Sequence, residues 1–268
     1  MEKYEPVKVL GCGAFGVVYL EENITTGDLV AIKHITKPLS SKKNFMTKVV
    51  REIVISRQLT GHKNITSFIE YSEDDKKIYI VYDYIHSSLP LTHWPIPDIT
   101  TREGRLILLD VIYQLVEAYQ FIHSQKIVHR DIKPANIVMK GNIPIIIDFD
   151  MACIFTPDSK YPCRGLAGTP NYLAPEVWLQ HKDIDYYLTD IYSLGVVLYY
   201  LINDRKVPYM GDSVDELRDN VLNVSPLPSS SGFRELDECI MLMINKDPQE
   251  RINLQIVKDI IQRLIKEV

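Results

Sequence analysis

The segment from Val128 to Val138 constrains this chain more than any other, because it sets polar and charged side chains between two apolar stretches. A long apolar pattern of helical spacing precedes it, and apolar strand-like residues follow directly. Burying many polar groups in a connection is costly unless they build a site. We therefore expect a functional site here, formed by His129, Arg130, Asp131, Lys133 and Asn136.

The composition is that of an ordinary globular protein. The chain has 268 residues, of which 46% are hydrophobic and 24% are charged, and its net charge is −5. A chain of this length buries roughly 70–75% of its unfolded surface, so it can hold a core without disulfides or metals. The acidic balance argues against general nucleic-acid binding, which leaves a basic footprint.

Cysteine spacing and apolar runs bear on the compartment. The four cysteines, at positions 12, 153, 163 and 239, show no CxxC or zinc-ligand spacing, which predicts free thiols in a reduced interior. The N-terminal residues lack the apolar run of a signal peptide. The longest apolar stretch, residues 191–202, is shorter than the ~20 residues that span a bilayer, and it predicts a buried helix. We expect a soluble intracellular monomer, cytoplasmic or nuclear, with neither membrane nor nucleic-acid partners.

The first third of the chain has strand patterns. Residues 4–10, 17–20 and 29–33, joined by short turns, predict an antiparallel sheet, and residues 66–71 and 77–84 add two strands. Residues 45–59 predict a helix packed on this sheet, since apolar residues recur at helical spacing. Those residues are Met46, Val49, Val50, Ile53 and Val54.

The pattern changes to helices after about residue 85. Residues 89–101 predict a loop, residues 102–124 a long helix, and residues 137–139 and 144–147 two short strands; the chain is mostly helical after Pro175. The fold class is therefore α+β, with one domain over residues 1–268. We expect a small β-rich lobe over residues 1–84, a larger helical lobe over residues 85–268, and a ligand site in the cleft between them.

Glycines recur as GxGxxG from Gly11 to Gly16. A dinucleotide-binding motif would require a helix after the glycines, but a strand pattern follows here. That context favours a flap over nucleotide phosphates, because missing side chains let backbone N–H groups approach an anion. A glycine-rich hairpin without a ligand is the alternative.

Three charged residues lie in apolar surroundings. Lys33 ends a strand and, taken alone, is typical of a surface lysine with a buried stem. Glu52 lies among apolar residues in the middle of a helix and needs a partner, for which Lys33 is suited. Asp148 follows an apolar run and is a candidate magnesium ligand, with a turn-forming aspartate as the alternative.

Taken in order, these motifs resemble the eukaryotic-type protein kinase catalytic domain of the serine/threonine class, over residues 4–265. The resemblance implies a bilobal fold, ATP and Mg²⁺ as cofactors, and transfer of the ATP γ-phosphate to Ser or Thr of protein substrates. The matching segments are GCGAFGVV from Gly11, AIK ending at Lys33, Glu52, HRDIKPAN from His129, Asp148-Phe149-Asp150, the run from Gly168 to Glu176, Asp190 and Arg251.

The resemblance also implies a role for each residue. Phosphoryl transfer needs positioning and charge neutralisation instead of a covalent nucleophile. The implied catalytic set is Lys33, which contacts the α/β-phosphates and pairs with Glu52; Asp131, which accepts the substrate proton; Lys133, which neutralises the transferred group; Thr169, which bridges Asp131 and Lys133; and Asn136 and Asp148, which hold Mg²⁺. The implied nucleotide-binding set is Leu10, Gly11, Cys12, Gly13, Ala14, Phe15, Gly16, Val17, Val18, Ala31, Lys33, Asp83, Ile85 and Val138, with Tyr82 limiting the back of the pocket.

The acceptor class follows from the same resemblance. Lys133, two residues after Asp131, resembles serine/threonine kinases, whereas tyrosine kinases place Ala-Ala-Arg or a similar run there. Glu176 with Arg251 resembles the family's buried ion pair. Ala135 gives no support for a basic substrate preference.

The chain departs from the family pattern at two places. Asp150 stands where the family has glycine, which gives the loop freedom to move, so we expect a stiffer loop. Because Asp tolerates the left-handed region better than most residues, we expect the active conformation at modest strain, with a turn role for Asp150 favoured over an extra metal ligand. Arg130 precedes a loop whose residues 163–167 carry no hydroxyl, and Thr156, Ser159 and Tyr161 lie upstream. We therefore hypothesise activity without loop phosphorylation.

Two rival functions remain. A catalytically dead scaffold with the same fold is disfavoured because Lys33, Glu52, Asp131, Asn136 and Asp148 are all present. A small-molecule or lipid kinase is disfavoured because residues 168–176 resemble a peptide-binding segment. A short stand-alone kinase would also suit a virus-infected host cell.

Overall fold

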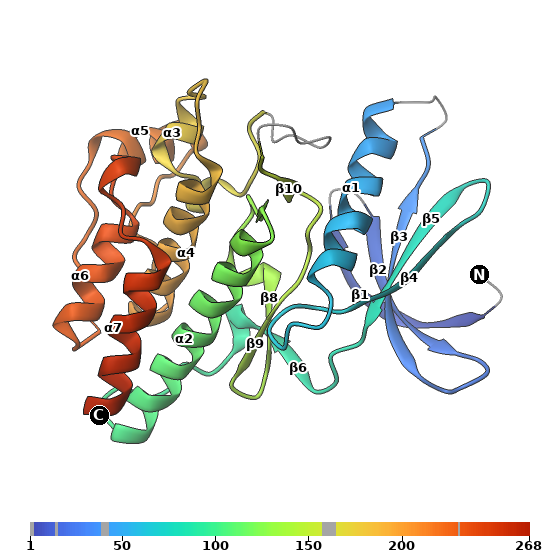
Figure 1. The fold of residues 1–268 in the computed structure, drawn as a ribbon, viewed down its shortest axis with the longest axis horizontal. Helices are drawn as coiled ribbons and strands as arrows, with labels where there is room; N and C mark the ends of the chain where they lie inside the picture. The colour runs from blue at the N-terminus through green and yellow to red at the C-terminus, as the bar shows by residue number, and fades with distance from the viewer. Residues whose placement is uncertain (1–2, 14–15, 39–42, 157–164, 230) are drawn as a thin grey trace.

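The computed structural model describes residues 3–13, 16–38, 43–156, 165–229 and 231–268, and these form the expected two-lobed α+β architecture (Figure 1). The smaller lobe is a five-stranded antiparallel sheet in the order β1-β2-β3-β5-β4, beside which one long helix lies. The elements of this lobe are β1 (Tyr4–Gly13), β2 (Gly16–Asn23), β3 (Leu29–Thr36), α1 (Lys43–Leu59), β4 (Phe68–Glu73) and β5 (Lys77–Asp83).

The glycine segment is more regular than the sequence predicts. Instead of interrupting the strands from Gly11 onward, β1 and β2 stay paired through Gly11 opposite Val18 and Gly13 opposite Gly16. Backbone hydrogen bonds between the strands do not depend on side chains, so the ladder continues through residues whose side chains predict a turn.

The buried face of helix α1 agrees only in part with the prediction, which is confirmed for Val49 and Ile53. Val49, Ile55 and Leu59 are buried, together with the polar Glu52 and Ser56, while Ile53 is half-buried. Met46, Val50 and Val54 are exposed instead of packed on the sheet. These three lie four residues apart and share the outer face of the helix, so apolar spacing alone did not separate the buried face from the exposed one.

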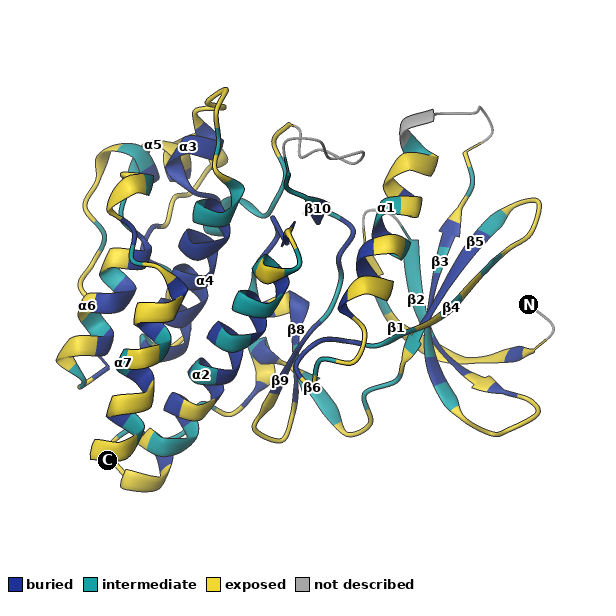
Figure 2. Cartoon of the chain, viewed as in Figure 1, coloured by how far each residue is buried: buried dark blue, intermediate teal, exposed yellow. Residues whose placement is uncertain are grey.

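The larger lobe is helical. Its central helix α4 is buried along most of its length (Figure 2), as the apolar run 191–202 predicts. The helices of this lobe are α2 (Arg102–Ser124), α3 (Pro175–Trp178), α4 (Tyr186–Ile202), α5 (Val214–Asn223), α6 (Arg234–Met243) and α7 (Leu254–Glu267), with short 3₁₀ turns at Leu91–His93, Pro134–Asn136, Pro170–Tyr172 and Pro248–Glu250.

Short strands of the larger lobe lie at both ends of the polar segment, residues 128–138. Strand β7 (Ile127–Val128) pairs with β10 (Cys153–Ile154), and β6 (Ser88–Pro90), β8 (Ile137–Lys140) and β9 (Ile143–Ile146) form a three-stranded sheet. The segment that holds Asp131 runs from β7 to β8, so both of its ends are anchored in strands. Residues 89–101, predicted as a loop, contribute the end of β6 and a 3₁₀ turn.

Within the described ranges one helix, α2, has the length and apolar composition to cross a membrane. More than half of that window, 56%, is buried inside the protein, as in the core helix of a soluble protein. Leu108, Leu109 and Ile112 of α2 are fully buried, and α2 packs against α7. We therefore describe α2 as a core helix.

The cysteines differ in part from the expectation of free thiols. Cys12 and Cys239 are free. Cys153, however, is disulfide-bonded, which contradicts the expectation at that position. Cys163 lies outside the described residues.

Candidate active site

The polar segment is anchored by one buried carboxylate from the helical lobe. Asp190 of α4 is 1% exposed and accepts hydrogen bonds from the backbone N–H groups of His129 (2.7 Å) and Arg130 (2.9 Å). His123 also contacts Asp190, at 3.0 Å. Arg130 adopts a left-handed φ of 67°, a strained conformation that persists only where surrounding contacts enforce it. Asp190 therefore fixes the backbone immediately before Asp131.

Asp131, Lys133 and Thr169 form a closed triangle. Lys133 Nζ lies 2.7 Å from Asp131 Oδ2 and 2.8 Å from Thr169 Oγ1, and the Thr169 hydroxyl donates to Asp131 Oδ1 at 2.7 Å. Burial alone would raise the pKa of Asp131, but the hydrogen bonds from Lys133 and Thr169 outweigh it and hold that pKa below its ordinary value. Asp131 is therefore an ionised carboxylate at neutral pH, suited to orient a hydroxyl and accept its proton.

Asn136 and Asp148 offer oxygen atoms beside this triangle. Asn136 Nδ2 donates to the backbone oxygen (2.9 Å) and to Oδ2 (3.1 Å) of Asp131, which turns the amide oxygen of Asn136 the other way. Asp148 has a left-handed φ of 63°, and its side chain is 34% exposed. Among the described residues, no cluster of three or more His, Cys, Asp or Glu could hold a metal. An amide and a carboxylate oxygen do fit Mg²⁺, which takes few protein ligands and completes its shell with water and phosphate.

Lys33 joins the two lobes. Its Nζ lies 2.7 Å from Glu52 Oε1 on α1 and 3.2 Å from Asp148 Oδ1, and the Lys33 side chain is only 7% exposed. Burial would lower the pKa of Lys33, but Glu52, Asp148 and Asp150 outweigh it and raise that pKa, so Lys33 is charged. Lys33 is therefore a fixed cation on β3, the middle strand of the sheet.

Strand register places the predicted adenine contacts on one face of the sheet. Val18 pairs with Lys33 and Ala31 pairs with Tyr82, while Ala31 and Lys33 are two residues apart on β3. Directly paired residues and residues two apart share a face, so Val18, Ala31, Lys33 and Tyr82 lie together.

The remaining predicted nucleotide contacts vary in position. Leu10 and Cys12 are exposed, Val17 and Val138 are half-buried, and Ala14 and Phe15 lie outside the described residues. A Cβ added at Gly16 would collide with the backbone oxygen of His34, so that glycine is needed for the packing of β2 on β3 with or without a ligand.

In the connection between lobes, two predicted residues are held by local hydrogen bonds. The Asp83 N–H donates to Ser67 O at 3.0 Å, and the Ile85 carbonyl accepts from Ser88 Oγ at 2.7 Å. These bonds fix the backbone that the resemblance assigns to the edge of the adenine.

Asp150 does not take the left-handed conformation expected at this position. The residue with positive φ in this segment is Asp148, and Asp150 is outside that region. The Asp150 carboxylate is 10% exposed and lies 3.8 Å from Lys33 Nζ, while its backbone oxygen accepts from Arg51 at 3.3 Å. Burial raises the pKa of Asp150 to about 6. Asp150 is thus an additional carboxylate facing Lys33, a role that the sequence did not indicate.

We expect that removing the Asp150 charge will strengthen ATP binding, because this carboxylate lies 3.8 Å from Lys33, to which the resemblance assigns phosphate binding. Asp150→Asn keeps the side-chain shape and Asp150→Gly also frees the backbone, so comparing the two variants separates charge from flexibility. Both variants should lower the KM for ATP about fivefold, as expected for one partly screened charge. The Mg²⁺ concentration for half-maximal activity should not change. A higher Mg²⁺ requirement in Asp150→Asn would show instead that Asp150 is a metal ligand.

Arg130 contacts a backbone carbonyl, a sulfur atom and an aromatic ring among the described residues. Its guanidinium donates to Gly165 O at 2.7 Å and lies 3.9 Å from Cys153 Sγ and 4.8 Å from the centre of the Tyr186 ring. Thr156 is described, whereas Ser159 and Tyr161 lie outside the described residues. The hypothesis of activity without loop phosphorylation therefore stays a prediction.

The segment after Thr169 is clamped to the helical lobe by an ion pair. Arg251 donates two parallel hydrogen bonds to Glu176, from Nη1 to Oε1 at 2.7 Å and from Nη2 to Oε2 at 2.8 Å. The Arg251 side chain is fully buried and that of Glu176 is 5% exposed. Two-point pairing of this kind fixes both distance and orientation, as the sequence predicts for this pair.

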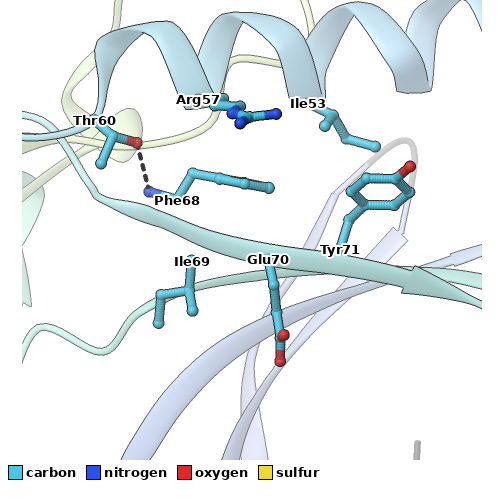
Figure 3. A pocket seen from close by; sticks show the side chains of 7 residues that line it. All are labelled: Ile53, Arg57, Thr60, Phe68, Ile69, Glu70 and Tyr71. Carbon is cyan, nitrogen blue, oxygen red and sulfur yellow. Dashed lines mark hydrogen bonds between the residues drawn. The ribbon is translucent and has the colours of Figure 1, made fainter.

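A cavity of about 470 Å³ lies between α1 and β4, away from the predicted site residues (Figure 3). Figure 3 shows Ile53 and Arg57 extending from the helix, and Phe68 in the gap between helix and strand. The other lining residues are Thr60, Ile69, Glu70 and Tyr71. None of the predicted site residues lines this cavity, so we do not assign the active site to it.

Sequence reasoning missed two further features of the site. Arg51, beside Glu52 on α1, contacts the backbone of Asp150. Tyr82 and Ser56 contact each other at 3.2 Å, and Tyr82 contacts Glu52. The only available signal was the spacing of Ser56, four residues after Glu52, which places both on one face of the helix.

Comparisons with known proteins agree with this geometry. The family described as "Protein kinase domain" matches residues 4–263. A protein named as a serine/threonine-protein kinase of Acanthamoeba polyphaga mimivirus is 38% identical over 240 residues, covering 88% of this chain and 86% of that protein. CBL-interacting serine/threonine-protein kinase 16 of Arabidopsis thaliana is 31% identical over 270 residues, covering 96% of this chain and 56% of the relative. Aurora kinase of Saccharomyces cerevisiae is 28% identical over 263 residues, covering 96% of this chain and 68% of that protein.

Proposed function

This chain belongs to the protein kinase family, and we propose that it is an active serine/threonine kinase that transfers the ATP γ-phosphate to hydroxyls of protein substrates. The observation that carries the proposal is the triangle of Asp131, Lys133 and Thr169. It sets an ionised carboxylate and a cation side by side. The charged Lys33, paired with Glu52, supplies a second cation from the other lobe.

The nucleotide would be held chiefly by the smaller lobe. Val18 and Ala31 present apolar surface to the adenine from one side, and Val138 from the other. The backbone of Gly11, Gly13 and Gly16 covers the phosphates, and Lys33, oriented by Glu52, binds them. Asn136 and Asp148 would hold Mg²⁺, which neutralises phosphate charge when it is bound.

The acceptor hydroxyl would be held by the larger lobe. Asp131 orients the hydroxyl and accepts its proton, while Lys133 offsets negative charge on the transferred group. The Thr169 hydroxyl keeps both side chains in register through its two hydrogen bonds. The proposed acceptors are Ser and Thr, because Lys133, which lies 2.7 Å from Asp131, stands where the resemblance to serine/threonine kinases has lysine.

The rival function is a scaffold that binds nucleotide without efficient catalysis. The contact of Asp150 with Lys33 is the observation in its favour, because it adds negative charge near the phosphates. The ion pair between Lys33 and Glu52, which is formed alongside that contact, favours the active enzyme. We further propose that the protein acts as a monomer on protein substrates inside the cell.

A transfer assay tests the proposal. The full chain is incubated with Mg²⁺, γ-labelled ATP and a library of Ser-, Thr- and Tyr-containing peptides, and label in peptide is measured against the Asp131→Asn variant. We expect label on Ser and Thr peptides with the unmodified chain. Nucleotide binding without transfer above the variant would favour the scaffold, and label confined to Tyr peptides would contradict the acceptor class.

A further inference from the structure

Tyr82 links strand β5 to helix α1. Its hydroxyl Oη lies 3.3 Å from Glu52 Oε1 and 3.2 Å from Ser56 Oγ. Glu52 and Ser56 are one helical turn apart on the buried face of α1 and are 3% and 1% exposed. A single phenol group on β5 therefore contacts two successive turns of the helix that carries Glu52.

The direction of these hydrogen bonds follows from the protons available. An ionised carboxylate can only accept, so the single proton of the Tyr82 hydroxyl points to Glu52. Ser56 then donates its own proton to the Tyr82 oxygen. Burial raises the pKa of Tyr82 well above its ordinary value, so the phenol keeps its proton.

The oxygen that Tyr82 contacts is the one that binds Lys33. Lys33 Nζ and Tyr82 Oη both reach Glu52 Oε1, at 2.7 and 3.3 Å. A carboxylate held by two donors on one oxygen has little freedom to rotate away from Lys33. The ring of Tyr82 is itself held, because it pairs with Ala31 across the sheet and packs edge-on against Phe68, with centroids 6.4 Å apart.

We infer that Tyr82 is a positioning residue that holds Glu52, and with it α1, in the place where Lys33 can bind phosphate. The hydroxyl of Tyr82 carries this role, and not the bulk of its ring, because a phenylalanine would fill the same space without holding Glu52. It rests on the proposed function only where activity is the readout, since the contact between strand and helix exists without substrate.

The test compares two Tyr→Phe variants of the same strand. Tyr82→Phe removes the hydroxyl that contacts Glu52. Tyr79→Phe is the matched control, because its hydroxyl bonds Asp74 at 2.7 Å, away from the active site. We expect Tyr82→Phe to lower kcat/KM for ATP about tenfold, as for loss of a hydrogen bond to a charged group. Tyr79→Phe should change it less than twofold.

A double-mutant cycle separates positioning from packing. If Tyr82 acts through Glu52, Tyr82→Phe should lower kcat/KM less than twofold further in a Glu52→Gln background. Equal losses in both backgrounds would show that Tyr82 acts by packing alone and would overturn the inference.

Amide hydrogen exchange of α1 provides a readout without catalysis. We expect faster exchange in residues 49–59 of Tyr82→Phe than in Tyr79→Phe, since one anchor of the helix is lost. If the unmodified chain transfers no phosphate, the proposed function fails, and exchange then decides the inference. Equal exchange in both variants would overturn it.

Discussion

Replacing Asp131 with Asn is expected to lower kcat for peptide phosphorylation by about 10²- to 10⁴-fold, the usual contribution of a positioned general base. The substitution keeps the shape of the side chain but removes the negative charge of the carboxylate. One oxygen of that carboxylate lies 2.7 Å from Lys133 Nζ, and the other accepts a hydrogen bond from the Thr169 hydroxyl at 2.7 Å. The amide cannot accept the substrate proton. The rate is measured at saturating ATP and peptide with γ-labelled ATP.

Two controls tie this loss to chemistry. Asp75→Asn removes a carboxylate from an exposed turn and should leave the rate unchanged. ATP affinity of Asp131→Asn should change less than threefold, because phosphate binding is assigned chiefly to Lys33 on the other lobe. A variant that keeps more than about a tenth of the normal kcat would contradict the role of Asp131.

The arrangement of the larger elements could be predicted from sequence because the signals were local. The long helix Arg102–Ser124 has the bounds that its apolar spacing predicts, and Asp131 and Lys133 are two residues apart in one loop, so their contact with each other is local. The partnership of Lys33 with Glu52 was predictable for another reason: a carboxylate in an apolar helix needs a counter-charge.

The missed features depend on three-dimensional packing. The exposed face of α1 could not be identified because apolar residues cover two of its faces, and only contact with the sheet selects Val49 over Val50. The place of Asp150 depends on its backbone angle and on Lys33 from the other lobe. Likewise, the hydroxyl of Tyr82 reaches Glu52 only because β5 and α1 pack closely, a distance that spacing along the chain does not encode.

The second large effect concerns stability: Arg251→Ala is expected to lower the free energy of unfolding by about 3–5 kcal/mol, the usual cost of breaking a buried ion pair. The change leaves the Glu176 carboxylate buried without its partner. It also removes the donors to Asn245 O and Leu188 O, both at 2.9 Å. For a chain of this size the melting temperature should fall by roughly 10 °C, measured by circular dichroism or calorimetry.

The exposed pair of Arg234 and Glu238, at 2.8 Å, is the matched control. Arg234→Ala should leave the melting temperature nearly unchanged, because water solvates both partners of a surface pair. A double variant, Arg251→Met with Glu176→Leu, should be more stable than Arg251→Ala, since it removes the unpaired buried charge as well as the pair. If Arg251→Ala and Arg234→Ala have the same melting temperature, the ion pair of Arg251 and Glu176 does not hold the segment after Thr169 in place. If the double variant is the less stable, an unpaired buried carboxylate at Glu176 costs less than the two introduced side chains, and the loss in Arg251→Ala does not come from the buried charge.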